Sequence, residues 1–227
     1  MRNFPTICVD DFYTDPDAVR NFALEQDFCY SSPEWPGRRT KNLDEISPIF
    51  FQSFCKKLFS IYYDLEDREI TWKVRTNFQL VKPYSEDENS PKNVGCIHRD
   101  DWLDIDGSNI ICAGIIYLTP KINRNCGTSI FKRINYRLND TTAKQDLYGN
   151  NIDTGFDQVI NEQDQQFEET ARFYNYYNRL VSFDASSYHG VNSFYSDEPR
   201  LTQPFFVCYI NSDQKYPLTR CAENNIL

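Results

Sequence analysis

Hydrophobic positions recur at two different spacings along the chain, and the spacing changes near residue 70. Before that point apolar residues recur three to four apart, as in an amphipathic helix. Thr14-Asp-Pro-Asp17 and Ser47-Pro48 carry helix-start residues, a side-chain acceptor followed by proline. We therefore predict one short helix after Pro16 and a second helix over 48–63. From Ile70 onward apolar and polar residues alternate, which is the period of a half-buried strand.

This alternation and several short apolar runs define the strand candidates. They are 6–12, 70–74, 78–80, 94–98, 108–118, 128–132, 179–184 and 201–210. The proline- and glycine-rich segment 31–40 is predicted to be a loop. The polar segment 133–178 is interpreted as an insertion or lid with a short helix near 167–176. Helices first and mostly strands afterwards predict an α+β, mostly β chain built around an antiparallel sandwich or barrel.

Length and charge narrow the classes of function. A chain of 227 residues buries a sufficient core as one domain. Its 24 Lys and Arg against 33 Asp and Glu leave no surplus of positive charge for phosphates, which disfavours nucleic acid and anionic membranes as partners. Mean hydropathy is −0.63, no stretch approaches a bilayer-spanning length, and residues 1–5 lack the apolar core of a secretory signal. We expect a soluble, non-secreted protein; its oligomeric state is left open.

The eight cysteines are scattered, with no C-x-x-C pair and no cluster of the kind that a structural zinc site needs. Most lie in apolar runs, such as Cys112 and Cys208, where a free cysteine behaves as a small core residue. We predict buried reduced thiols and a cytoplasmic location. For a protein encoded by a virus, this location would be the cytoplasm of the host cell.

Both histidines of the chain fall in segments that favour metal binding. His98 and Asp100 lie two apart in a predicted strand, so their side chains project to the same side and can share one ion. His189 follows the strand 179–184 and is placed to add a second imidazole from a neighbouring strand. Two histidines and one carboxylate on one face leave positions open on an octahedral ion, as in non-haem Fe(II) oxygenases. The competing interpretation is two ordinary core or surface histidines.

A second pair of residues favours binding of a carboxylate. Arg200 stands at the head of the strand that follows His189, and Thr202 points the same way two residues later. A guanidinium beside a hydroxyl suits bidentate capture of a carboxylate, such as the distal end of a dicarboxylate cosubstrate.

Taken together, these motifs resemble the iron(II)/2-oxoglutarate-dependent dioxygenases, in particular the branch near prolyl 4-hydroxylases. The ordered matches are His98-Arg-Asp100, residues 115–119 (IIYLT), residues 126–131 (CGTSIF), residues 188–191 (YHGV) and Arg200-Leu-Thr202. They cover roughly 70–210. Residues 35–40 (WPGRRT) and 117–120 (YLTP) also resemble an uncharacterised, partly viral branch of that superfamily.

The resemblance implies a double-stranded β-helix, also called a jelly roll, in one domain. Residues 1–68 would form a helical N-terminal support, 70–210 the core with its polar insertion at about 133–178, and 211–227 a tail. It also implies Fe(II), 2-oxoglutarate and O2 as reactants, with ascorbate in support, and hydroxylation of an unactivated C–H bond. The halogenating variant lacks the carboxylate ligand, so the presence of Asp100 disfavours it.

The resemblance assigns a role to each matching residue. His98, Asp100 and His189 would ligate iron, and Arg200 would bind the distal carboxylate of 2-oxoglutarate. Tyr117 would hydrogen-bond that carboxylate, although a tyrosine that ends an apolar strand is also common as ordinary core. Two further partners of the cosubstrate are expected, Thr202 and Gln79.

The substrate is left open between classes. Protein or peptide hydroxylation of the prolyl type comes first by resemblance, and a free amino acid or small metabolite follows because the 133–178 insertion could close over a small pocket. Demethylation of nucleobases is disfavoured by the net charge and by Phe206, where that group carries a second arginine. Alternatives of another kind are a non-enzymatic jelly roll, for example a virion or carbohydrate-binding component, and a cupin-like iron or zinc enzyme that needs neither Arg200 nor Thr202.

Overall fold

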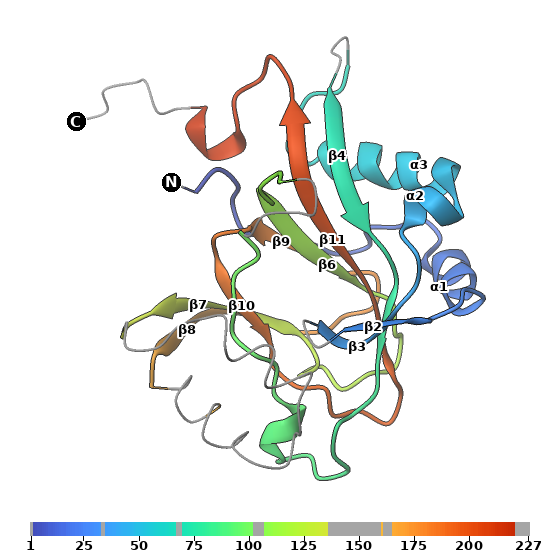
Figure 1. Ribbon diagram of the computed structural model, residues 1–227, viewed down its shortest axis with the longest axis vertical. Coiled ribbons are helices and arrows are strands. Elements are labelled where there is room, and N and C mark those ends of the chain that lie inside the picture. The colour runs from blue at the N-terminus through green and yellow to red at the C-terminus, as the bar shows by residue number, and fades with distance from the viewer. Residues whose placement is uncertain are drawn as a thin grey trace.

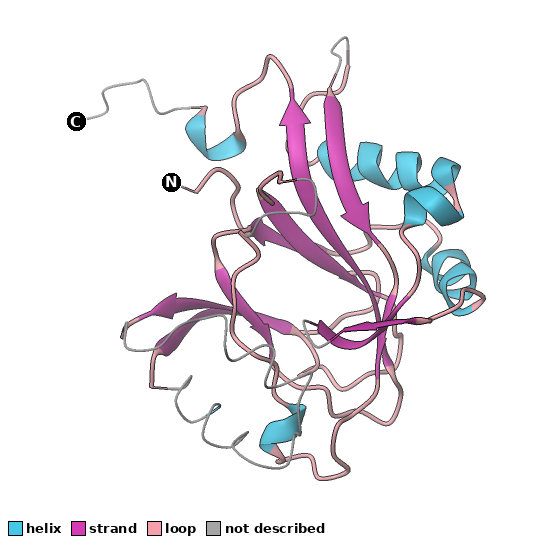
Figure 2. Cartoon of the chain, in the orientation of Figure 1, coloured by secondary structure: helices cyan, strands magenta, loops and turns pink. Residues whose placement is uncertain are grey.

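Two antiparallel sheets and a small group of helices form the part of the chain that the computed structural model describes. The described residues are 2–32, 35–66, 70–101, 107–135, 160 and 165–220. Figures 1 and 2 show the three α-helices gathered on one side of the larger sheet and the smaller sheet on its other side. The chain is therefore mostly β, as the residue pattern predicted.

The larger sheet has eight strands in the order β1-β9-β6-β11-β5-β3-β2, with β4 paired to β11 off this path. Their bounds are β1 Ile7–Val9, β2 Tyr30–Ser32, β3 Trp35–Arg39, β4 Thr71–Thr76, β5 Gln79–Val81, β6 Cys112–Tyr117, β9 Leu180–Asp184 and β11 Arg200–Asn211. Strand β11 is the longest and pairs with β4, β5 and β6. It therefore connects the middle of the sheet to the edge that β3 and β2 form.

The smaller sheet has three strands in the order β10-β7-β8. They are β7 Thr128–Arg133, β8 Phe167–Phe173 and β10 Tyr188–Val191. His98 extends this sheet by an isolated bridge to His189 of β10. A core cluster lies between the two sheets, since Tyr117 and Phe183 from the larger sheet pack with Ile130 from the smaller one.

The helices are α1 Pro16–Leu24, α2 Leu43–Ile46 and α3 Pro48–Phe59, followed later by the short 3₁₀ turns Pro91–Asn93 and Pro217–Thr219. Both predicted start signals act as N-caps: the Asp15 side chain accepts from the Ala18 N–H and the Ser47 side chain from the Phe50 N–H. No helix among the described residues combines the length and apolar character that crossing a membrane requires.

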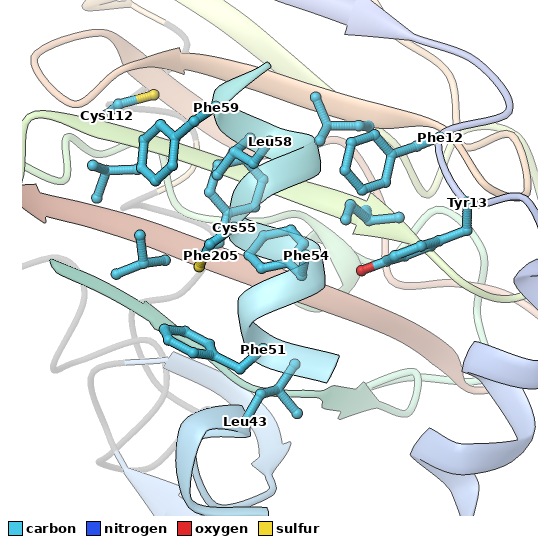
Figure 3. Close-up of a cluster of buried hydrophobic side chains, with 14 of the residues drawn as sticks. Phe12, Tyr13, Leu43, Phe51, Phe54, Cys55, Leu58, Phe59, Cys112 and Phe205 are labelled. Carbon is cyan, nitrogen blue, oxygen red and sulfur yellow. The ribbon is translucent and has the colours of Figure 1, made fainter. Parts of the chain in front are cut away.

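Helix α3 and the larger sheet enclose the main core, which Figure 3 shows around Phe54, Leu58 and Phe205. The rings of Phe54 and Phe205 meet edge to face with centroids 5.7 Å apart. Because successive strand residues point to opposite faces, the neighbours of Phe205 in β11 turn toward the smaller sheet. Phe206 accordingly packs against the cluster between the sheets.

Four expectations for single elements were wrong. The segment 167–176 is not a helix, because 167–173 form β8 against β7. The segment 94–98 makes only the bridge at His98, and the second helix ends at Phe59 instead of 63. The expected loop 31–40 contains most of the β2–β3 hairpin. It is extended because β3 pairs with β5.

Several expectations concern residues that the structure describes only in part. Within the insertion at 133–178, residues 136–159 and 161–164 lie outside the described residues. In the tail 211–227, residues 221–227 lie outside them. Residues 1–68 contribute strands β1, β2 and β3 in addition to helices. The division into support, core and tail stays a prediction.

Seven of the eight cysteines lie in the described part of the chain, and all seven are free. Five are buried, while Cys8 and Cys29 are exposed. Burial raises the pKa of the Cys55 and Cys112 thiols to about 12 and that of Cys126 to about 11. These three thiols stay protonated at neutral pH.

Candidate metal centre

The structure brings His98, Asp100 and His189 together between the two sheets. One ligand atom from each residue lies within 4.8 Å of the others. Asp100 stands between the imidazoles, with Oδ1 3.6 Å from His98 Nε2 and Oδ2 3.2 Å from His189 Nε2. Two nitrogen donors and a carboxylate thus converge on one point.

Backbone pairing holds the three side chains on one face. The His98 N–H donates to the His189 carbonyl at 2.9 Å, and the His189 N–H donates back at 2.8 Å. Residues directly opposite in an antiparallel pair project to the same side. The Asp100 N–H donates to the Ala185 carbonyl at 2.9 Å, which ties the H-x-D segment to the end of β9.

A glycine permits this close pairing. A Cβ added at Gly95 would lie 2.6 Å from the Val191 carbonyl oxygen, to which the Gly95 N–H donates. Any larger residue would push the segment that carries His98 away from β10. The geometry of the candidate metal centre therefore depends on Gly95 as well as on His98, Asp100 and His189.

Each imidazole is oriented by a backbone carbonyl. His98 Nδ1 lies 2.8 Å from the Cys96 oxygen, and His189 Nδ1 lies 3.0 Å from the Ser187 oxygen. A carbonyl only accepts, so each Nδ1 carries the hydrogen and each Nε2 presents its lone pair to the cluster. Metal-binding histidines are typically anchored in this way. The donor set fits a divalent metal such as Fe(II).

Two of the three residues are buried, while the His98 side chain is 22% exposed. His189 is 7% exposed and Asp100 is 6% exposed. The Phe183 ring stacks beside His189 with centroids 4.3 Å apart. Phe183 is a site residue that the sequence analysis missed, because an apolar residue in an apolar strand carries no signal of a metal site.

Arg200 and Thr202 lie on the same face of β11, as predicted. Arg200 is 1% exposed, and its Nε donates to the Cys126 carbonyl at 2.8 Å. Thr202 is fully buried, and no described residue provides its Oγ1 with a hydrogen-bond partner. A buried hydroxyl without a partner is costly, and Thr202 Oγ1 is therefore available to a hydrogen-bonding group.

Tyr117 and Gln79 flank Thr202 in register, one on each side. The Tyr117 ring lies 5.5 Å from Arg200 Cζ, and its hydroxyl donates to Thr128 Oγ1 at 2.9 Å. Burial raises the pKa of Tyr117, and the Arg200 charge opposes that shift only in part, so the phenol stays protonated. Gln79 is 4% exposed, and its Nε2 donates to the Pro36 carbonyl at 2.7 Å.

Comparisons with known proteins identify the family of this chain and proteins that share its fold. A family model described as "Family of unknown function (DUF6445)" matches residues 2–194. No curated protein matches the chain. HygX from Streptomyces hygroscopicus with iron bound is 12% identical, with a TM-score of 0.54 over 89% of this chain and 81% of HygX. The structure of HygX with nickel and 2-oxoglutarate bound gives 14% identity and a TM-score of 0.52 over 89% and 82%.

A prolyl hydroxylase from Trichoplax adhaerens, in complex with a hypoxia-inducible-factor peptide fragment, covers 97% of this chain and 87% of its own. It is 12% identical with a TM-score of 0.49, a similarity too low to support a conclusion. The similarity to HygX shows a common fold.

Proposed function

The chain belongs to the DUF6445 family, and we propose that it is an Fe(II)- and 2-oxoglutarate-dependent oxygenase with a double-stranded β-helix fold. One observation carries the proposal: His98, Asp100 and His189 converge within 4.8 Å, with both Nδ1 atoms anchored on carbonyls. The similarity to HygX, which was crystallised with iron and with 2-oxoglutarate, supports the class.

In this proposal His98 and His189 donate Nε2 and Asp100 donates a carboxylate oxygen to Fe(II). Bound Fe(II), together with 2-oxoglutarate and O2, supplies the oxidation of an unactivated C–H bond coupled to formation of succinate and CO2. The protein fixes the imidazole tautomers through the Cys96 and Ser187 carbonyls and places the Asp100 carboxylate between the two Nε2 atoms. It also limits access of water, since His189 and Asp100 are buried.

We assign the distal carboxylate of 2-oxoglutarate to Arg200 and Thr202. The guanidinium provides charge and paired donors, and Thr202 Oγ1 provides a hydroxyl that is otherwise unused among the described residues. Tyr117 adds a protonated hydroxyl beside Arg200. Gln79 faces the same space, but its Nε2 is already bonded to Pro36, so we propose only its Oε1 as a contact.

The substrate that we propose is a peptide, as for prolyl-type hydroxylases, or an amino-acid-like small molecule. The motif order around His98, Asp100 and His189 supports the prolyl-type branch. We propose the cytoplasm as the location, and the seven free cysteines of the described chain support a reducing compartment.

The test is uncoupled turnover and metal content in a matched pair of variants. Asp100→Ala removes a proposed ligand, and Asp101→Ala removes the exposed carboxylate next to it, which pairs with Arg99 at 3.4 Å. We expect wild type and Asp101→Ala to hold one iron per chain and to form succinate from 2-oxoglutarate under air. Asp100→Ala should lose both properties.

Two results would contradict the proposal. Wild-type protein that neither retains iron nor forms succinate would favour a non-enzymatic scaffold. Iron retention with metal-dependent oxidation that survives Arg200→Ala would favour an iron enzyme that does not use 2-oxoglutarate.

A further inference from the structure

Arg39 lies on the same sheet face as Thr202 and Gln79, which are proposed to bind the cosubstrate. In the larger sheet Arg39 of β3 is opposite Gln79 of β5, and Gln79 is opposite Thr202 of β11. Directly opposite residues of antiparallel strands project to one side, so Arg39 points to the side that Thr202 faces. The sequence analysis did not identify Arg39 as a site residue.

The Arg39 guanidinium is held by aromatic rings. Its Cζ lies 4.5 Å from the Trp35 ring centroid and 5.9 Å from that of Phe206. Among the described residues the Arg39 side chain forms no hydrogen bond or ion pair, and its Nε is buried without a partner. Stacking orients a guanidinium but leaves the edge with its N–H donors available to a ligand.

The fold fixes this stacked arrangement. Residues four apart in a regular strand are separated by about 13 Å. Gly37 lies between Trp35 and Arg39 with φ of +67°, and a Cβ there would meet the Leu80 carbonyl oxygen at 2.3 Å. The Gln79 amide holds the same strand through the Pro36 carbonyl. A bend at Gly37 therefore brings the Trp35 ring beneath the guanidinium.

The Arg39 charge interacts with the charges of Asp100 and Arg75. Burial lowers the pKa of Arg39 to about 10, the Asp100 charge opposes this shift, and the Arg75 charge adds to it. Arg39 stays positive at neutral pH. Arg75 is opposite Phe206 in the pairing of β4 with β11, so it projects to the same face. Two cations thus border the Phe206 ring in a chain whose net charge is −9.

We propose that Arg39, stacked on Trp35 and Phe206, binds a carboxylate of the oxygenase substrate, and that Arg75 adds a second positive charge to this site. The inference rests on the proposed function, which it deepens by naming the substrate class. Arg200 and Thr202 serve the cosubstrate, and the planar Arg39 fork serves the substrate. A planar guanidinium pairs its two parallel N–H donors with the two oxygens of one carboxylate.

The test compares probes that differ only in charge. N-acetyl amino acids and their primary amides are titrated calorimetrically into the anaerobic protein loaded with Fe(II) and saturating 2-oxoglutarate. We expect at least one carboxylate to bind tenfold or more tightly than its amide, as a charge-assisted bidentate contact requires. Arg39→Met should reduce that preference to about twofold or less. Arg38→Met, whose side chain is exposed on the opposite face, should keep it.

Several outcomes would overturn the inference. They are equal binding of carboxylate and amide by wild type, absence of binding by every probe, and a preference that persists in Arg39→Met. Competition between the carboxylate probes and 2-oxoglutarate, with weaker 2-oxoglutarate binding in Arg39→Met, would assign Arg39 to the cosubstrate instead. The wild-type comparison does not depend on folding of any variant.

Failure of the proposed function is recognised separately. Calorimetry of the probes requires no turnover, while succinate formation and iron content report on the oxygenase itself. An Arg39-dependent charge preference without iron retention or succinate would refute the oxygenase and retain the carboxylate site. Succinate formation without the preference would retain the oxygenase and refute the site.

Discussion

Replacing Thr202 with valine is expected to change two properties in opposite directions. The side chain is fully buried, and its Oγ1 has no hydrogen-bond partner among the described residues. A buried hydroxyl without a partner costs roughly 1–3 kcal/mol in protein mutational data. Valine has nearly the same shape and suits a strand, so the ligand-free variant should gain about 1–2 kcal/mol in free energy of unfolding. For a chain of this size that gain raises Tm by about 2–8 °C.

The same substitution should weaken binding of 2-oxoglutarate. A hydrogen bond to a charged acceptor contributes about 1.5–3 kcal/mol, which corresponds to about a tenfold to hundredfold change in Kd. Urea denaturation without ligand measures the first effect, and anaerobic calorimetry with Fe(II) present measures the second. A gain in stability together with a loss of affinity is the pattern expected of a hydroxyl reserved for a ligand.

Thr76→Val is the matched control on the neighbouring strand. Thr76 is 1% exposed, and its hydroxyl donates to the Pro204 carbonyl at 2.9 Å and accepts from Gln203 Nε2 at 3.2 Å. This variant should lose about 1–3 kcal/mol of stability and keep its affinity for 2-oxoglutarate. Destabilisation of Thr202→Val by about 1 kcal/mol or more would contradict a hydroxyl reserved for a ligand. A Kd for 2-oxoglutarate that stays within twofold of wild type would contradict it as well.

Three further outcomes are expected. Phe54→Ala removes a ring that is 1% exposed and packed on Phe205. It should lower the free energy of unfolding, measured by urea denaturation, by about 3–5 kcal/mol. A loss below about 1 kcal/mol would contradict the assigned core. Burial acts to raise the pKa of Asp184, but hydrogen bonds from the Ser186 side chain and from three backbone N–H groups hold this pKa below its usual 3.8. The ionised carboxylate therefore stabilises the fold above about pH 4, and this contribution is lost as pH falls through the lowered pKa. Asp184→Asn should be less stable than wild type at pH 7, and the difference in stability should shrink below about pH 4. A constant difference from pH 7 to pH 3 would refute this assignment. In maleimide labelling followed by peptide mass spectrometry, exposed Cys29 should react well before buried Cys112, whose pKa is raised to about 12, and equal rates would refute the burial.

Local spacing predicted one pair within the candidate metal cluster, and His189 was joined to that pair through the family resemblance. His98 and Asp100 lie two apart, and that spacing places both on one side of extended backbone. The alternation in 201–210 likewise predicted that Arg200 and Thr202 share a face, which β11 confirms. These residues could be assigned without knowing which strands pair.

Other parts of the site depend on pairing that the sequence does not display. Strand β10 is four residues long and lacks alternation, and it forms because β7 and His98 flank it. The β3 strand lies in a proline- and glycine-rich segment that was expected to be a loop. The position of Arg39 opposite Gln79 therefore follows only from the register of β3 with β5. The expected helix near 167–176 fails for the same reason, since pairing with β7 decides its conformation.

We propose that His98, Asp100 and His189 form an Fe(II) site that also receives 2-oxoglutarate. Anaerobic addition of Fe(II) and then 2-oxoglutarate, followed by visible absorption spectroscopy, measures both binding events at this site. We predict a weak visible charge-transfer band that saturates at one iron per chain in wild type and in Asp101→Ala and is absent in Asp100→Ala. Absence of the band in wild-type protein, or its persistence in Asp100→Ala, would contradict the claim.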